Sequence, residues 1–192
     1  MPIEETLEAL HDVVKAGKGR YIGVSSMFAW QFAEAQYIAQ LDGWTPFVSM
    51  QSQYNLLTRE DERELHPFCL DQGVGVLPWS PLARGKLTRD WETTSERINT
   101  DPLGQTLYKQ ADTEDRKIVD SVTAIADARG SARAQVALAW LMQRAVVSSP
   151  IVGATKPGHL DDAVAAVELE LTGEEVAQLE AHYTPHAMEG FA

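Results

Sequence analysis

The chain has little of what marks several common classes of protein. Its 192 residues include a single cysteine, Cys69, which excludes a disulfide framework within the chain and fits a reducing compartment. No apolar run approaches the ~20 residues that span a bilayer, and the acidic, amphipathic N-terminus does not read as a signal peptide. Basic residues never exceed two in a row, and the net charge is −12. These features argue against a nucleic-acid or membrane partner and predict a cytoplasmic globular protein.

Short motifs for nucleotide or metal sites are also missing. The sequence contains no GxGxxG, no P-loop and no His/Cys cluster with the spacing of metal ligands. No metal site is therefore expected. An anionic ligand would need a pocket whose local positive charge overcomes the negative charge of the whole chain.

What the sequence does contain is a regular alternation of helix and strand patterns. Strands of mostly apolar residues separated by helices predict a parallel sheet covered on both faces. We expect one α/β domain over residues 1–192, with too few units to close a barrel of eight strands. Strands are predicted over 20–25, 46–51, 73–80 and 146–153, and helices over 3–17, 29–41, 60–72, 114–129, 132–144, 159–167 and onward from Thr172.

Two helix starts and one long loop add detail to this prediction. Ser131 is a candidate N-cap, and Thr172 with Glu175 forms a capping-box pattern. Residues 82–113 are irregular and rich in Thr, Asp, Arg and Gly, and a loop of that length is usually functional or disordered. We expect this loop to be mobile and to become ordered on a bound cofactor.

Polar groups follow every predicted strand. Alone, each has a plainer explanation, since serines cap turns, a strand-end tryptophan usually packs, and a lysine is usually a surface group. Together they favour a ligand site, because the carboxyl ends of parallel strands form one rim. The rim consists of Ser25 and Ser26; Gln51, Gln53 and Asn55; Trp79 and Ser80; and Gly153, Ala154, Thr155 and Lys156.

Two parts of this rim suit a planar heterocycle that carries phosphates. Trp79 supplies a flat ring beside the Ser80 hydroxyl and a loop with two cations, Arg84 and Lys86. The turn at 153–156 leads into a short helix, so it offers backbone N–H groups, a helix N-terminus and the Lys156 cation.

Four segments in this order resemble the C-terminal half of the aldo-keto reductases, which are (β/α)8 oxidoreductases that use NADP(H). RYIGVSS (20–26), FVSMQSQYNLL (47–57), GVLPWSPLARGKLT (75–88) and SSPIVGATKPGHLDDAV (148–164) resemble the fifth to eighth strands with their loops. The resemblance covers essentially the whole chain. It implies half of a TIM-type parallel β/α barrel, whose partner half is missing or supplied by self-association.

The resemblance also implies roles for individual residues. Ser25, Ser26 and Gln51 would bind the nicotinamide carboxamide, and Trp79 would stack on the ring. Ser80, Leu82, Arg84 and Lys86 would lie along the pyrophosphate and ribose. Gly153, Ala154, Thr155 and Lys156 would approach the 2′-phosphate, with His159 and Asp162 near the adenosine. Ser26 and His159 stand where the family usually has Asn and Arg. The implied preference for NADP(H) over NAD(H) therefore rests mainly on Lys156.

No catalytic residue is expected in this chain. The family takes its catalytic Asp, Tyr, Lys and His from strands that precede the matched segment, and Tyr54 has no neighbouring strand-end lysine to lower its pKa. Three interpretations stay open. The chain is the cofactor half of a reductase of small carbonyl compounds, a non-catalytic nucleotide-binding or interaction half-barrel, or a truncated inactive remnant. Open strand edges predict self-association.

Overall fold

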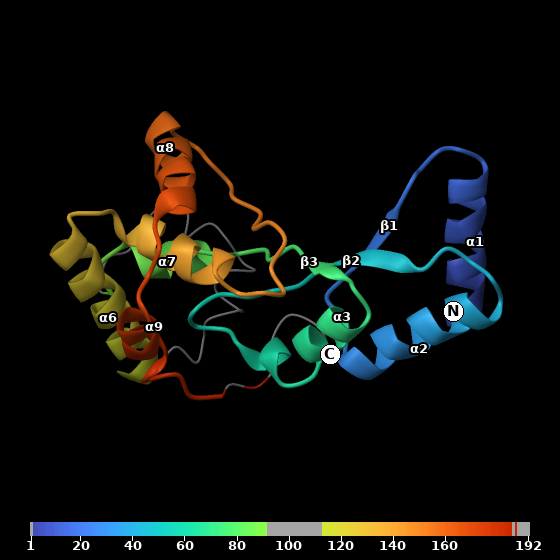
Figure 1. Cartoon of the computed structure of the whole chain (residues 1–192), viewed down its shortest axis with the longest axis horizontal. Coiled ribbons are helices and arrows are strands. Elements are labelled where there is room, and N and C mark those ends of the chain that lie inside the picture. The colour runs from blue at the N-terminus through green and yellow to red at the C-terminus, as the bar shows by residue number, and fades with distance from the viewer. Residues whose placement is uncertain (1, 92–112, 186, 188–192) are drawn as a thin grey trace. The chain divides into compact units, whose positions relative to one another are not determined.

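The computed structural model describes residues 2–91, 113–185 and 187, so most of the loop expected over 82–113 lies outside the described residues. The chain divides into two compact units (Figure 1). Unit 1 comprises Met1–Ser52 and Asp61–Leu77, and unit 2 comprises Gln53–Glu60 and Pro78–Ala192. The expectation of one domain stays a prediction.

Unit 1 is a parallel sheet with helices. Its strands β1 (Ile22–Ser25), β2 (Phe47–Gln51) and β3 (Gly75–Val76) lie in the order β1-β2-β3. The helices are α1 (Ile3–Lys15), α2 (Ala29–Leu41) and α3 (Leu65–Asp71). The side chain of Gln36 on α2 bonds both the N–H and the carbonyl of Phe47, at 2.9 and 3.0 Å. This pair of bonds fixes α2 on β2, and Phe32 adds an edge-on contact with Phe68.

The helix expected over 60–72 begins later than predicted. A 3₁₀ turn, Glu60–Glu62, precedes α3, which starts at Leu65. Pro67 explains this start, because proline lacks an N–H and is tolerated only in the first turn of a helix. A helix running through from Glu60 would have placed Pro67 in its interior.

Unit 2 is mostly helical. It contains α6 (Thr113–Arg129), α7 (Arg133–Met142), α8 (Pro157–Ala165) and α9 (Gly173–Glu180), with 3₁₀ segments η2 (Ala83–Thr88) and η3 (Ala166–Glu168). Its core is centred on α7, where every residue from Val136 to Leu141 is buried. The largest fully buried side chains in this core are Tyr54, Leu56, Leu57, Leu87, Ile118, Trp140, Leu141 and Leu179.

The third and fourth predicted strands differ most from the expectation. The third is limited to Gly75–Val76, and residues 146–153 form no extended strand in the described part of the chain. The third and fourth predicted strands were expected to pair. Between these segments a backbone hydrogen bond runs from Ile151 N–H to the Pro78 carbonyl at 2.8 Å. Pro78 and Pro150 explain this, because neither has an N–H to donate to a ladder.

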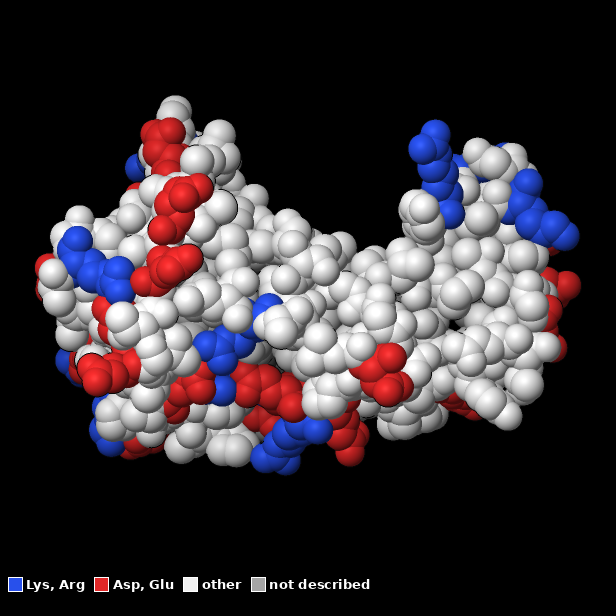
Figure 2. All heavy atoms as spheres, viewed as in Figure 1, with Lys and Arg blue, Asp and Glu red and all other residues white. Residues whose placement is uncertain are grey.

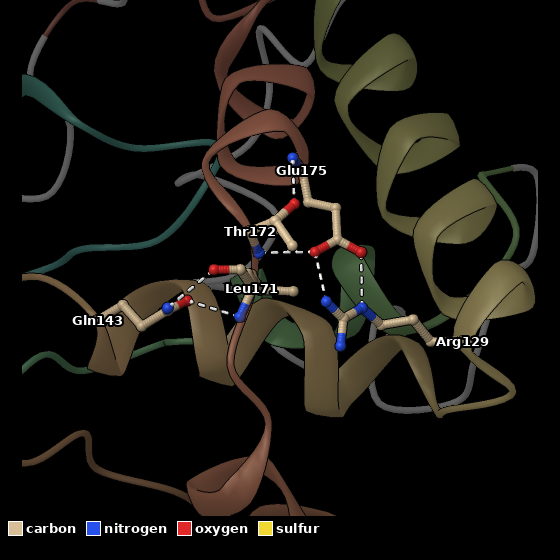
Figure 3. A network of polar contacts seen from close by, with 5 residues as sticks. All are labelled: Arg129, Gln143, Leu171, Thr172 and Glu175. Atoms are coloured by element: carbon tan, nitrogen blue, oxygen red, sulfur yellow. Dashed lines mark hydrogen bonds and ion pairs between the residues drawn. The ribbon is translucent and has the colours of Figure 1, made fainter.

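Of the two predicted helix starts, the one at Thr172 is confirmed and the one at Ser131 is wrong. Thr172 and Glu175 form the predicted capping box of α9, with Thr172 N–H bonded to the Glu175 carboxylate and Glu175 N–H to the Thr172 hydroxyl (Figure 3). Ser131 is not an N-cap. Its N–H donates to the Ala126 carbonyl while Gly130, at φ 62°, bonds Asp127, so Ser131 belongs to the Schellman motif that ends α6. Ala132 caps α7.

Two negative findings apply to the described residues only. No helix among them is both long and apolar enough to cross a bilayer. Nor do three or more of their His, Cys, Asp and Glu side chains gather in a way that could hold a metal ion.

Candidate functional site

The ends of β1 and β2 bring three of the predicted cofactor residues together in unit 1. Ser25 pairs with Gln51 in the parallel register, and its Oγ donates to the Gln51 carbonyl at 2.8 Å. The N–H of Ser26 donates to the same carbonyl at 3.1 Å. A hydroxyl has one hydrogen, so Ser25 Oγ retains only the capacity to accept a hydrogen bond from a ligand amide.

Ser26 adopts a backbone conformation that is rare for a side-chain-bearing residue. Its φ is 41°, in the left-handed region. Such residues persist where surrounding bonds hold them, and they cluster at binding and catalytic sites. The bond from Ser26 N–H to Gln51 supplies that restraint here.

In unit 2, the Trp79–Ser80 turn is held by backbone and side-chain bonds. Trp79 forms a parallel bridge with Gln53. Ser80 has a left-handed φ of 55°, and its carbonyl accepts from Ala83 N–H and from Asn55 Nδ2, each at 2.9 Å. Trp79 and Ser80 are both partly exposed, so a ligand can reach them.

The loop after this turn is preformed. Ala83, Arg84 and Gly85 are consecutive left-handed residues, at φ 47°, 53° and 91°. The Leu82 carbonyl accepts from Gly85 N–H, and the Arg89 guanidinium donates to the carbonyls of Gly85 and Arg84 at 3.0 and 2.9 Å. At Gly85 a side chain would be strained by the φ of 91°, and its Cβ, 2.5 Å from Arg89 Nη2, would displace the guanidinium.

Lys86 is a half-buried cation in this loop. Burial lowers the pKa of its ammonium, while the Asp115 carboxylate opposes the shift and Arg89 adds to it. The Nζ atom lies 4.6 Å from the centroid of the Trp91 ring, within cation–π distance. A partly desolvated ammonium held in this way interacts more strongly with an anion than a fully hydrated one does.

The turn at 153–156 is exposed along its length. Lys156 is the N-cap residue of α8. His159 bonds back to the turn, with Nδ1 3.4 Å from Thr155 N and 3.5 Å from Thr155 Oγ1. One carboxylate oxygen of Asp162 accepts from Gln135 at 2.8 Å. Figure 2 shows acidic side chains in the region of α8, so an anion here would depend on Lys156 and the helix N-terminus.

Four side chains whose chemistry could serve catalysis are instead packed or hydrogen-bonded within the fold. Tyr54 is buried in the core of unit 2 against Trp140, with ring centroids 5.4 Å apart. His11 Nδ1 bonds the N–H and hydroxyl of Thr45. His66 is buried, and burial lowers its pKa to about 4. Cys69 is a core residue whose pKa burial raises to about 11, which keeps its thiol protonated and unreactive.

Three residues shape this region without having been assigned a cofactor contact from the sequence. Asn55 holds the Ser80 carbonyl, Arg89 ties down the loop, and Trp91 faces Lys86. Asn55 lay on the predicted rim, and only its position after a strand could have indicated it. Arg89 and Trp91 act through contacts that no local pattern shows.

Comparison with known proteins gives consistent results. The Aldo/keto reductase family matches residues 1–184. The chain is 48% identical to versiconal hemiacetal acetate reductase of Aspergillus parasiticus over 189 residues, which is 97% of this chain and 55% of that protein. It is 45% identical to an aldo-keto reductase of Fusarium vanettenii over 192 residues, 99% of this chain and 51% of that one.

The fold agrees with a solved member of the same family. A crystal structure of a thermostable aldo-keto reductase bound to the inhibitor epalrestat superposes with a TM-score of 0.71 at 30% identity, covering 95% of this chain and 55% of that one. The parallel sheet and its helices are therefore part of a (β/α)8-type fold. The chain spans about half the length of the relatives it matches. With the family match over residues 1–184, this chain belongs to the aldo/keto reductase family of oxidoreductases.

Proposed function

We propose that this chain binds NADP(H) and is the cofactor-binding half of a reductase of small carbonyl compounds. The observation that carries the proposal is the preformed loop from Ser80 to Trp91, which holds the half-buried Lys86 ammonium in a chain of net charge −12. A fixed, partly desolvated cation in an acidic protein is the feature that an anionic cofactor requires.

The donor set on the described residues fits such a cofactor. In unit 1, Ser25 Oγ is available to accept from a carboxamide, with Ser26 and Gln51 beside it. In unit 2, Trp79 offers a ring for stacking. Lys86, with Arg84, Ser80 and Leu82, would bind the pyrophosphate. Gly153, Ala154, Thr155 and Lys156 would bind a 2′-phosphate near His159 and Asp162, and NAD(H), which lacks that phosphate, is the alternative cofactor.

The chemistry of such a complex is divided between cofactor and protein. When bound, the cofactor supplies the hydride that reduces a carbonyl. The residues of this chain bind and orient it. Reduction also needs a proton donor, and a donor tyrosine needs a neighbouring cation to lower its pKa. Tyr54, the strand-end candidate, is buried in a core instead. Turnover therefore depends on a proton donor beyond the described residues of this chain.

Unit 1 has a place where another polypeptide could bind. A cavity of about 710 Å³ lies among α1, β1 and α2, lined in part by Leu7, Leu10, Val24 and Trp30. Within the described sheet, β1 pairs only with β2 and so keeps one open edge. Right-handed β-α-β connections place the strand before a helix beside the strand after it. A parallel strand beside β1 and against α1 would complete such a unit.

A non-catalytic nucleotide-binding half-barrel is the second candidate, favoured by the burial of Tyr54. The test is oxidation of NADPH with 4-nitrobenzaldehyde, measured for the chain alone and after co-expression with the part of versiconal hemiacetal acetate reductase that it does not match. Turnover only in the co-expressed sample supports the reductase half. NADPH binding with no turnover in either sample supports the non-catalytic module. Absence of NADPH binding contradicts both.

A further inference from the structure

Asn55 joins two segments of unit 2 through a single buried amide. Its side chain is fully buried. Nδ2 donates to the Ser80 carbonyl at 2.9 Å, and Oδ1 accepts from Leu57 N–H at 2.9 Å. The amide provides both a donor and an acceptor at the side-chain end, and only this orientation of the amide satisfies both contacts. The side chain is therefore specific to its position rather than replaceable by another polar group.

The segment that carries Asn55 is itself rigid. Asn55 and Thr58 exchange backbone bonds at 3.2 and 3.1 Å, and Tyr54, Leu56 and Leu57 are buried in the core of unit 2. The following residue, Arg59, forms an ion pair with Glu180 at 3.2 Å and lies over the Trp140 ring at 5.4 Å. Asn55 thus projects from a fixed platform toward the Ser80 carbonyl.

Ser80, in contrast, sits in a conformation that needs support. A left-handed φ of 55° is uncommon for a serine, and the chain continues into three further left-handed residues after Leu82. The peptide that contains the Ser80 carbonyl is part of the turn from which the Trp79 ring and the Ser80 hydroxyl extend. The Asn55 amide bonds the carbonyl of that peptide and so restrains its orientation.

We propose that Asn55 is a positioning residue, which holds the Ser80 carbonyl and thereby presents Trp79 and Ser80 to the cofactor. The inference rests on the proposed function, because it assigns a role in the same site. Asn55 acts through the backbone of its neighbour and is not itself a ligand. Its loss should loosen the turn and weaken binding without removing a cofactor contact.

The test uses Asn55→Ala and Asn55→Asp in the whole chain. Asn55→Ala removes both amide bonds, so hydrogen exchange at the Ala83 amide, which also bonds Ser80 O, should speed up about three- to tenfold. The Kd for NADPH should rise by a similar factor. Gln143→Ala is the matched control, because Gln143 also bridges two backbone groups in unit 2, those of Leu171 (Figure 3). It should change neither readout.

Asn55→Asp separates positioning from general stability. The ionised carboxylate still accepts from Leu57 N–H but cannot donate to Ser80, whereas the protonated acid can. Protection of the Ala83 amide, relative to its intrinsic exchange rate, should therefore recover in Asn55→Asp between pH 8 and pH 5, and not in Asn55→Ala. Unchanged Ala83 protection in both variants would overturn the positioning role. Failure of the wild-type chain to bind NADPH would instead overturn the proposed function.

Discussion

Lys86 and Lys156 are two of the cations that we propose bind the cofactor phosphates, and their surroundings differ. Lys86 is half-buried, close to the Trp91 ring, with Asp115 acting on it electrostatically. Lys156 is exposed at the N-cap of α8. A buried cation is part of the architecture of its loop, and its removal would disturb that loop. The exposed one can be removed with little structural cost, so it is the better probe of ligand recognition.

Lys156→Ala should weaken NADP(H) binding and spare NAD(H). A charge-assisted contact to the 2′-phosphate is worth about 1.5–3 kcal/mol, or roughly one to two orders of magnitude in Kd. Added salt should narrow the difference between wild type and variant, since Lys156 is exposed. Isothermal titration with both cofactors measures this, with Lys18→Ala as an exposed lysine control. An equal loss for both cofactors would mean that Lys156 stabilises the turn and does not read the phosphate.

His66 should make stability depend on pH below neutrality. Burial lowers its pKa to about 4, opposed by Glu62. As the pH falls, His66 takes up a proton first in the unfolded state, near pH 6.5. The free energy of unfolding therefore keeps the full contribution of neutral His66 above pH 6.5 and loses it as the pH falls towards 4. The loss by pH 5 is about 2 kcal/mol. Urea midpoints at pH 7.5 and 5 should show a smaller drop in His66→Gln than in wild type.

The control for this change is His182→Gln, at a half-exposed imidazole 3.9 Å from Glu114. It should retain the full drop between pH 7.5 and pH 5. A drop of equal size in wild type and His66→Gln would show that other groups cause the acid sensitivity.

At the scale of elements, α9 depends on its first turn. Glu175 accepts from Arg129 in a paired arrangement and from Thr172 N–H at 2.7 Å (Figure 3). The Arg129 bonds are the main reason, with the Thr172 bond second, that the pKa of Glu175 lies near 2. A carboxylate with a lowered pKa stabilises the fold above its unfolded pKa, near 4.5, and that contribution is lost as the pH falls from 4.5 to 2.

Glu175→Gln should therefore lower the urea midpoint at pH 7 and flatten its dependence on pH between 4.5 and 2. The effect is modest, because the pair lies near the surface and is screened by salt. Glu174→Gln, its exposed neighbour in the same turn, should leave the pH dependence as in wild type. If Glu174→Gln and Glu175→Gln behaved alike, the bonds to Arg129 and Thr172 would have no measurable part in stability.

The elements that the sequence predicted well are those whose pattern is local. Asp42 and Gly43 marked the end of α2 at Leu41, and the capping box marked the start of α9. The strand expected over 146–153 depends on pairing with another segment, and prolines on both sides interrupt that pairing. The roles of Asn55 and Arg89 arise from contacts distant in sequence, which explains why the candidate site was only partly foreseen.

For the whole chain, exposed apolar surface bears on association with other chains. On α8 and η3, Leu160, Val164 and Val167 are 59%, 62% and 65% exposed. Their spacing of four and three residues places them on one helix face. In unit 1, β1 has its open edge beside the cavity. Apolar faces and open strand edges favour association with another chain.

We predict that the chain self-associates at micromolar concentration. Light scattering should give a mass that is a multiple of 21.2 kDa. Val164→Lys should shift the mass toward the monomer, because it places a charge in the exposed apolar face of α8. Asp161→Lys, a larger charge change outside that face, should not. A strictly monomeric wild-type chain would contradict the prediction.

The central claim is that this half-length member of the aldo/keto reductase family binds NADP(H). The most direct measurement is isothermal titration of the whole chain with NADPH, at low and moderate salt. We predict saturable binding of one NADPH per chain, weakened by added salt and by Lys156→Ala. No binding of either NADPH or NADH by the folded chain would contradict it.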